Sequence, residues 1–218
     1  MLYRPLFTTS FFLDDFLVDN DFFGAGNVIL TSASSKTSLG LAHLLHENRR
    51  DRCRVIGLTS AGNRDFVSGL GCYDVVYTYD DVGRLPAEPS VMVDMAGSGT
   101  VRAAVHEHLA DQLAYSCAVG ATHWDSATVG TGDRDLPGPK PEMFFAPSQI
   151  QKRMAEWGQE KFNALMATAW QGFLAASENW IAVEARSGVD ALSSTYEDFL
   201  EGRADPAKGY VLSLQGDH

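Results

Sequence analysis

The chain has 218 residues, 45% of them hydrophobic, and its 28 acidic and 17 basic residues give a net charge of −11. Such a chain can bury the core of one large domain, while its charge excludes non-specific binding to nucleic acid or to an anionic membrane. It has no apolar run near the roughly 20 residues of a membrane-spanning helix and no basic start typical of a signal peptide, so we expect a cytoplasmic protein.

The cysteines and histidines do not form a metal-binding pattern. Cys53, Cys72 and Cys117 are odd in number, and none belongs to a Cys-x-x-Cys pair. This spacing is untypical of disulfide scaffolds and zinc sites, so we expect three buried thiols. His106 and His108 would point to different sides of a helix, and we expect both at the surface. No metal site is predicted.

Strands and helices alternate through the first 119 residues. An amphipathic helix that contains Phe11 to Leu17 comes first, and short apolar runs then alternate with segments that carry apolar residues at helical spacing. The predicted strands are 28–30, 55–58, 75–77, 91–93 and 115–119, and the predicted helices between them are 38–48, 63–70 and 100–113. This alternation predicts an α/β fold of the Rossmann type, a doubly wound parallel sheet with flanking helices.

The pattern changes after residue 119. A Gly/Pro-rich connection at 130–141 leads to helical patterns from 147 to about 186 and from 189 to 200, and an apolar run at 210–214 predicts a strand outside the main sheet. Pro147 suits the first turn of a helix. We therefore divide the chain into an amino-terminal helix at 1–26, a dinucleotide-binding domain at 27–150 and a helical extension that ends in a strand at 151–218.

A serine-rich stretch follows the first predicted strand, where nucleotide-binding α/β proteins carry a glycine-rich turn. The stretch ILTSASSKTSLGLA, residues 29–42, contains a single glycine. By itself it is more typical of a Ser/Thr-capped helix start than of a phosphate site. A helix amino terminus here would still offer N–H groups and hydroxyls to an anion, and Lys36 would add a charge. The glycine-lysine motif of nucleoside triphosphatases is excluded, because Leu30 occupies its first glycine position.

The second predicted strand ends without the Asp or Glu that binds the ribose 2′-hydroxyl in NAD sites. The sequence GLTSAGNR, residues 57–64, has no carboxylate before Asp65. Ser60, Asn63 and Arg64 instead offer the donors and the cation that a 2′-phosphate needs. The alternative is a turn capped by Ser60 with Arg64 in solvent. The pattern favours NADP(H) over NAD(H) and disfavours a methyltransferase, which would also want an acid here.

Small residues follow the fourth and fifth predicted strands, among them Gly97, Gly120 and Ala121. They would let a nicotinamide riboside lie against the backbone. Asp94, at the end of the fourth strand, would either hold a neighbouring loop or contact the ligand. The chain has no Tyr-x-x-x-Lys pair and no nucleophile elbow with a Ser-His-acid order, so no catalytic residue is predicted.

These segments resemble the coenzyme domain of medium-chain dehydrogenases/reductases, in the zinc-independent quinone and enoyl reductase branch, and most closely the DUF2855 family attached to that superfamily. The resemblance rests on VILTSAS at 28–34, SLGLA at 38–42, RVIGLTS at 54–60, FVSGLGCYDVVYTY at 66–79 and VMVDMAG at 91–97. The narrower match rests on PLFTTSF at 5–11, SASSKTS at 32–38, LGCYD at 70–74, FFAP at 144–147 and GYVLSL at 209–214.

The resemblance implies a cofactor, NADP(H), and a reaction, zinc-independent hydride transfer to a carbonyl, quinone or activated alkene. It places Tyr79 near the adenine and the small residues named above near the nicotinamide half. It implies a pyrophosphate turn of Ser32, Ala33, Ser34, Lys36, Thr37 and Ser38, a 2′-phosphate site of Ser60, Asn63 and Arg64, approach of Thr9 and Ser10 to the nicotinamide ring, and closure by Phe144 and Phe145.

Members of that superfamily also carry a GroES-like substrate domain before the coenzyme domain. This chain begins where the coenzyme domain would start, so we expect the substrate domain to be absent from it. A non-catalytic NADP(H)-binding module, acting as a sensor or subunit, is therefore the alternative to an enzyme. The expected partners are a small-molecule substrate and a second copy of the chain, paired through an edge strand near Phe144 and Phe145.

Overall fold

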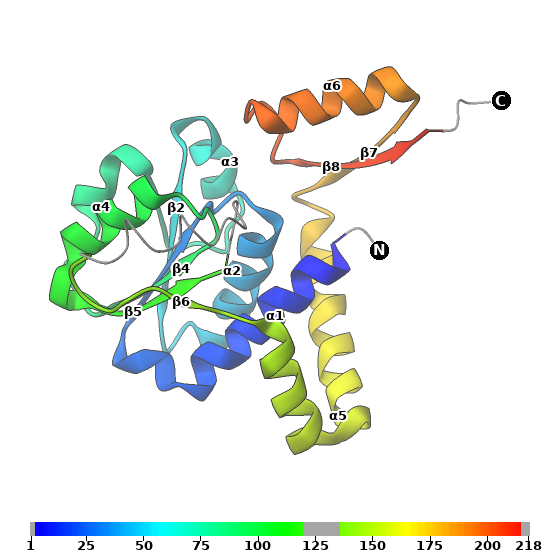
Figure 1. Cartoon of the computed structure of the whole chain (residues 1–218). Coiled ribbons are helices and arrows are strands. Elements are labelled where there is room, and N and C mark those ends of the chain that lie inside the picture. The colour runs from blue at the N-terminus through cyan, green and yellow to red at the C-terminus, as the bar shows by residue number, and fades with distance from the viewer. Residues whose placement is uncertain (1–2, 120–135, 215–218) are drawn as a thin grey trace.

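The computed structural model describes residues 3–119 and 136–214. These residues form a parallel six-stranded sheet in the order β3-β2-β1-β4-β5-β6, with helices on both faces (Figure 1). Its strands are β1 (Asn27–Thr31), β2 (Arg54–Thr59), β3 (Val75–Thr78), β4 (Ser90–Asp94), β5 (Leu113–Ala118) and β6 (Glu142–Met143). The strand order reverses between β1 and β4, which is the switch point of a doubly wound fold. The predicted fold class and its five predicted strands are confirmed.

Two helices of this part begin at side-chain caps. Ser35 caps α2 (Lys36–Arg49) by accepting a hydrogen bond from the Ser38 N–H at 3.3 Å, and Ser98 caps α4 (Gly99–Leu109) in the same way. Such caps satisfy backbone donors that have no partner inside the helix. The remaining helices are α1 (Arg4–Asp19), which packs against α2, and the short α3 (Arg64–Gly69).

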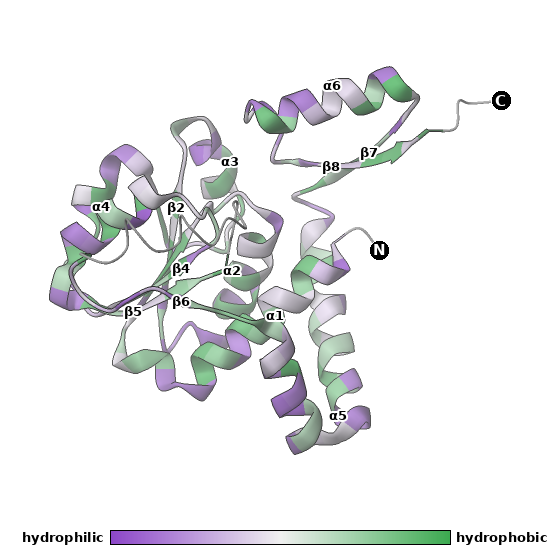
Figure 2. Ribbon diagram, viewed as in Figure 1, coloured by the Kyte–Doolittle hydropathy of each residue, from purple (hydrophilic) through white to green (hydrophobic). Residues whose placement is uncertain are grey.

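The two central strands carry the core. Every residue of β1 and β4 is buried, as expected for parallel strands covered on both faces, and Figure 2 shows green, hydrophobic residues in the sheet around the label β4. Alternate residues serve opposite faces: Val28 and Leu30 pack with Leu41 of α2, whereas Ile29 packs with Val105 of α4. The three cysteines are buried, as predicted.

The prediction of a surface position for His106 is wrong. His106 is fully buried on α4. Its Nδ1 lies 2.9 Å from the Pro137 carbonyl oxygen and its Nε2 lies 2.9 Å from the Ser116 hydroxyl. A histidine can be buried when both ring nitrogens have partners. Both partners here lie outside the helix, so helical spacing alone did not show them.

The long helix α5 (Ala146–Ser177) has Pro147 in its first turn, as predicted, and is broken at Gly158, whose φ of 75° is left-handed. The two segments therefore run in different directions beside α1 (Figure 1). Stacked rings join the segment after Gly158 to α1: the centroids of Phe12 and Phe162 lie 5.6 Å apart, and those of Phe7 and Phe173 lie 4.8 Å apart.

The predicted continuation of this helix to about residue 186 is wrong. α5 ends at Ser177, and β7 (Ala182–Ser187) follows it. β7 pairs in parallel with β8 (Lys208–Ser213), and α6 (Val189–Leu200) connects the two. The sequence predicted α6 and a strand outside the main sheet, and both are present. We call β7, α6 and β8 the C-terminal unit. Because β7 becomes a strand by pairing with a segment beyond α6, its local composition did not reveal it.

Candidate functional site

Three connections meet at the carboxyl ends of the central strands. β1 lies between β2 and β4, with Thr31 paired to Leu58 and Leu30 paired to Val93. The connections that follow these strands are therefore neighbours at the switch point, where doubly wound proteins bind their ligands. They are the β1–α2 turn (residues 32–35), the β2–α3 turn (residues 60–63) and the β4–α4 turn (residues 95–98).

The β1–α2 turn is held in a tight conformation without glycine. Ser32 has a φ of 47°, and its carbonyl oxygen accepts a hydrogen bond from the Ser35 N–H at 2.8 Å. The Ala33 N–H donates to Leu58 of β2 at 3.2 Å, and the Ala33 carbonyl oxygen accepts from the Tyr73 hydroxyl at 2.8 Å. A non-glycine residue with a left-handed φ is uncommon and is typical of a conformation that its surroundings impose.

A hydrogen bond joins the β1–α2 turn to the β2–α3 turn. The Asn63 side-chain amide donates to the Ser34 hydroxyl oxygen at 3.0 Å. Ser60 is half-buried beside Asn63, and Arg64 is exposed as the first residue of α3. The structure thus brings Ser34, which was predicted to contact the pyrophosphate, next to Asn63, which was predicted to contact the 2′-phosphate of the same cofactor.

The β4–α4 turn is held by the carboxylate of Asp94, which is 1% exposed. One oxygen accepts hydrogen bonds from the Thr31 hydroxyl at 2.7 Å and from the N–H groups of Ala96 and Gly97 at 3.1 Å each. The other oxygen accepts from Arg102 at 2.9 Å. Of the two predicted roles for Asp94, the structure therefore shows the holding of a loop, since a buried carboxylate needs such partners.

Lys36 reaches the C-terminal unit. It is the first residue of α2, and its amino group donates to the carbonyl oxygen of Pro206 in the connection between α6 and β8. Burial lowers the pKa of Lys36 to about 8, and the nearby carboxylate of Asp205 opposes that shift. The positive end of α2 and a lysine that loses its proton easily thus lie in one place.

Two residues that were predicted to contact the ligand are buried and hydrogen-bonded to the backbone instead. Ser10 is fully buried, with its hydroxyl 2.7 Å from the Thr37 carbonyl oxygen and 3.1 Å from that of Leu6. Ser38 is also fully buried and donates to the Thr31 carbonyl oxygen at 3.0 Å. The structure therefore presents neither hydroxyl at the surface.

The remaining predicted residues differ in exposure. Tyr79 is half-buried and hydrogen-bonded to Ser32, and burial raises the pKa of its phenol. Thr9 is half-buried, and its hydroxyl donates within α1 to the Pro5 carbonyl oxygen at 3.4 Å. Phe144 packs on Phe16 with ring centroids 5.4 Å apart, whereas Phe145 is 63% exposed. Gly97 lies in the β4–α4 turn with a φ of 63°. Gly120 and Ala121 lie outside the described residues.

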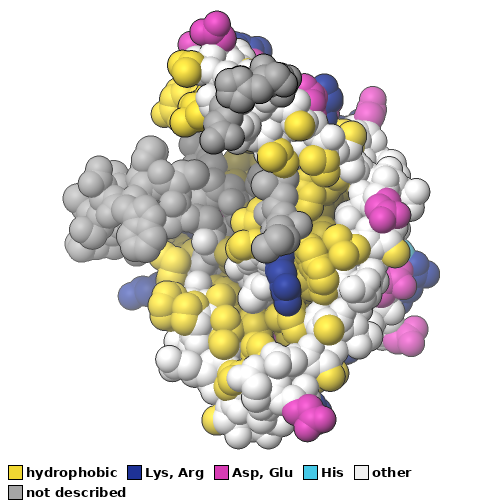
Figure 3. Space-filling model, turned by 90° about the vertical axis from the view of Figure 1, so that its right-hand side faces the viewer, with side chains coloured by type: hydrophobic (Ala, Val, Ile, Leu, Met, Phe, Trp, Pro, Cys, Tyr) yellow, Lys and Arg dark blue, Asp and Glu magenta, His cyan; other side chains and the backbone are white. Residues whose placement is uncertain are grey.

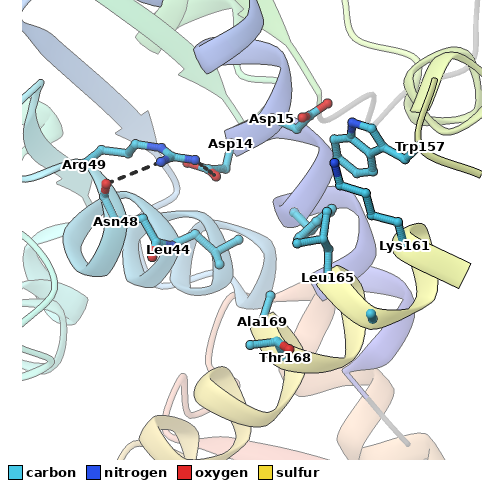
Figure 4. Close-up of a pocket in the computed structure, with 12 residues that line it drawn as sticks. Asp14, Asp15, Leu44, Asn48, Arg49, Trp157, Lys161, Leu165, Thr168 and Ala169 are labelled. Carbon is cyan, nitrogen blue, oxygen red and sulfur yellow. Dashed lines mark hydrogen bonds and ion pairs between the residues drawn. The ribbon is translucent and has the colours of Figure 1, made fainter. Parts of the chain in front are cut away.

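A cavity that the sequence did not indicate lies away from these turns, between α1, α2 and α5. This groove has a volume of about 510 Å³, and its walls combine apolar residues such as Leu44 and Trp157 with charged ones such as Lys161 (Figure 4). Figure 4 shows Asp14 pointing toward Arg49, and their ion pair spans 3.1 Å. Burial raises the pKa of Asp14, and Arg49 opposes the shift. The groove lies along the carboxyl-terminal half of α2, so a helix of this length separates it by roughly 10–20 Å from the β1–α2 turn.

The described residues contain neither a membrane-spanning helix nor a cluster of metal-binding side chains. None of the helices within 3–119 and 136–214 combines the length and the apolar character needed to cross a membrane. In the same two ranges, no three His, Cys, Asp or Glu side chains gather closely enough to hold a metal ion.

Several solved structures share this fold. The yhdH oxidoreductase from Salmonella enterica in complex with NADP has a TM-score of 0.57 and 13% identity, over 96% of this chain and 61% of that chain. YhdH from E. coli K-12 with bound NADPH has a TM-score of 0.55 and 14% identity, over 95% and 62%. A putative NADPH:quinone reductase from Mesorhizobium loti has a TM-score of 0.56 and 14% identity, over 84% and 51%.

These identities establish likeness of fold. The chain spans about three fifths of the length of the two YhdH structures and about half that of the quinone reductase. A search of curated proteins found no match. The model of the family described as "Protein of unknown function (DUF2855)" matches residues 1–205. That match covers nearly the whole chain and confirms the resemblance seen in the sequence: the protein belongs to the DUF2855 family.

Proposed function

We propose that this protein binds NADP(H) at the carboxyl ends of β1, β2 and β4 and acts as a zinc-independent reductase. The observation that carries the proposal is the Asn63–Ser34 hydrogen bond, with Arg64 exposed beside it and no carboxylate at the end of β2. This bond joins the β1–α2 turn, which is suited to a pyrophosphate, to the β2–α3 turn, beside which Arg64 is suited to a 2′-phosphate. The bound NADP and NADPH of the similar YhdH structures support the same cofactor.

The donors present fit a dinucleotide. The pyrophosphate would lie at the amino end of α2, where the helix dipole is positive and where Ser32, Ser34 and Thr37 offer hydroxyl groups. Lys36 would add its charge by turning from the Pro206 carbonyl oxygen toward the phosphates. Ala33 would contribute backbone. Ser38 supports the same turn from beneath through its bond to Thr31.

The 2′-phosphate would bind at the β2–α3 turn. The Arg64 guanidinium and the Ser60 hydroxyl would donate to its oxygens, and Asn63 would hold the turn against Ser34. An acidic residue at the same place would repel the phosphate, so its absence from 57–64 favours NADP(H) over NAD(H).

The nicotinamide half would lie along the β4–α4 turn. When bound, the reduced cofactor would supply a hydride to a carbonyl, quinone or activated alkene. Gly97, held by Asp94, would let the ring approach the backbone. Tyr79 would flank the adenine. Thr9 would approach the ring from α1, where Ser10 anchors the helix to α2, and Phe144 and Phe145 would close the site.

The test is a titration with NADPH and NADH, followed by cofactor oxidation against quinones, aldehydes and enones. We expect tighter binding of NADPH and turnover with at least one of these classes. Tight binding of NADPH without turnover would favour the alternative, a non-catalytic module. Failure to bind either nucleotide would overturn both.

Arg64→Ala tests the 2′-phosphate site. We expect it to weaken NADPH binding by about 1–3 kcal/mol, because a charge-assisted contact is lost, and to leave NADH binding nearly unchanged. Arg54→Ala is the matched control, since Arg54 is an exposed arginine at the other end of β2. Equal losses for both cofactors in Arg64→Ala would contradict the assignment.

Pairing of two copies belongs to the same proposal. Among the described residues, β6 is the last strand of the sheet, and Met143 and Phe145 beside it are 57% and 63% exposed. An open edge with apolar side chains favours strand pairing between copies. Sedimentation equilibrium would then give twice the chain mass, and Met143→Lys would reduce it to the chain mass.

A further inference from the structure

The β1–α2 turn must present backbone N–H groups to a phosphate without the glycines that usually allow it. Its central peptide bond joins Ala33 to Ser34, and Ala33 is fully buried. The Ala33 N–H is already bonded to Leu58 of β2. The orientation of the Ala33–Ser34 peptide plane is therefore fixed by the hydrogen bond that the Ala33 carbonyl oxygen accepts.

That carbonyl oxygen accepts a hydrogen bond from the Tyr73 hydroxyl at 2.8 Å. Tyr73 lies between α3 and β3, outside all three turns of the site. In a planar trans peptide the C=O and the N–H point in opposite directions. Because the Ala33 carbonyl points inward to Tyr73, the Ser34 N–H points outward, to the side on which a phosphate would lie.

The path of the Tyr73 side chain depends on Gly57. A Cβ atom at Gly57 in β2 would lie 2.9 Å from Cδ1 and 3.2 Å from Cε1 of the Tyr73 ring, and 3.2 Å from the Ala33 Cβ. Carbon atoms do not approach this closely without displacement. The ring thus crosses the backbone of β2 at the one residue that leaves room for it. Burial also raises the pKa of the Tyr73 phenol well above its usual value, so the hydroxyl keeps the proton that it donates.

We infer that Tyr73 is a positioning residue for the dinucleotide: it turns the Ala33–Ser34 peptide so that the Ser34 N–H faces the pyrophosphate, and Gly57 makes room for it. This inference rests on the proposed function, because it names how that cofactor site is built. Tyr73 acts through the backbone of the turn and would not touch the 2′-phosphate. It therefore affects NADPH and NADH alike.

The experiment compares the dissociation constants of NADPH and NADH for the whole chain and for Tyr73→Phe, which keeps the ring and removes the hydroxyl. We expect both constants to rise by the same factor, about 3- to 10-fold for one hydrogen bond. Tyr115→Phe is the matched control, because it removes the bond from Tyr115 to Glu142 at 3.2 Å and leaves the site intact. Its constants should equal those of the wild type.

Gly57→Ala provides a second test of the inference. It compares cofactor binding in single and double variants, so a change in folding stability alone does not decide it. Gly57→Ala should displace the ring and weaken both cofactors. Its effect on binding should be smaller when Tyr73→Phe is already present, because the part that acts through the Tyr73 hydroxyl is then already lost, whereas the 3.2 Å contact with the Ala33 Cβ remains. Gly26→Ala is its control, since a Cβ there meets no atom within 4 Å. Thermal unfolding of each variant shows whether it is folded.

The outcomes separate the two proposals. If the wild type binds NADPH and Tyr73→Phe binds both cofactors equally well, the inference is overturned and the proposed function stands. A loss confined to NADPH would overturn it too, since that pattern belongs to the 2′-phosphate. If the wild type binds neither nucleotide, the proposed function fails and the inference fails with it.

Discussion

The central sheet and the C-terminal unit are built from the same elements but bury them differently. Both contain parallel strands joined by a helix. In the central sheet Ile29, Leu30 and Met92 are fully buried, whereas in the C-terminal unit Val183 is 65% exposed and Phe199 is 60% exposed. Parallel strands are usually covered on both faces. The comparison shows that a β-α-β unit can form even where few of the described residues cover its strands and its helix.

Polar contacts connect the parts of the C-terminal unit. Arg186 of β7 donates to the Thr195 hydroxyl of α6 at 2.8 Å and lies over the ring of Tyr210 at 4.5 Å. α6 meanwhile carries an exposed apolar stripe of Val189, Leu192, Tyr196, Phe199 and Leu200. Figure 3, which views the molecule from the right of Figure 1, shows hydrophobic side chains at the surface, some of them at the top, where the C-terminal unit lies in Figure 1. The stability of the unit therefore owes less to apolar burial than that of the sheet.

The largest expected effect compares two phenylalanines. Phe12→Ala removes a fully buried ring that stacks on Phe162 and should lower the free energy of unfolding by about 3–5 kcal/mol. Phe199→Ala, in the exposed stripe, should lower it by less than about 1 kcal/mol. Urea denaturation measures both. Similar losses would break the comparison, because they would show that the stripe is covered in solution.

Two buried threonines give a smaller effect. Thr31→Val removes a hydroxyl that bonds to Asp94 and accepts the Met95 N–H, and the polar groups left unpaired should cost about 1–3 kcal/mol of unfolding free energy. Thr195→Val removes one bond from Arg186, which can turn to water, and should cost about 1 kcal/mol or less. A greater loss for Thr195→Val in urea denaturation would reverse the ranking of the two regions.

Lys36, which links the two regions, should give the smallest effect. Its pKa is lowered to about 8, and a bound phosphate would favour its charged form. Above pH 8 the free protein must take up a proton to bind, so the dissociation constant of NADPH should rise between pH 7.5 and 9.5, by at most about tenfold per pH unit.

The controls for this prediction are Lys36→Arg and Lys36→Ala. Lys36→Arg stays charged and should remove the pH dependence. Lys36→Ala should weaken NADPH and NADH alike and should also be independent of pH in this range. The same slope in all three proteins would exclude Lys36 as a phosphate ligand.

Much of the candidate site could be predicted because it follows from chain order. The turns after β1, β2 and β4 come at the carboxyl ends of neighbouring parallel strands, so their residues were expected to meet. The burial of Ser10 and Ser38 could not be predicted in this way. Their hydroxyls bond to the backbone of α2 and β1, and residue type alone does not distinguish a serine that faces a ligand from one that faces the core.

By itself the sequence determined the five strands, the doubly wound α/β fold and α6, because hydrophobic periodicity is a local property of short segments. Only the tertiary structure decided that 182–187 form a strand, that His106 is buried, that Lys36 reaches Pro206 and that Tyr73 holds Ala33. Each of these depends on a partner far along the chain. Such a hydrogen bond or strand pairing forms only when folding brings two distant segments together, and the local sequence of either segment does not predict it.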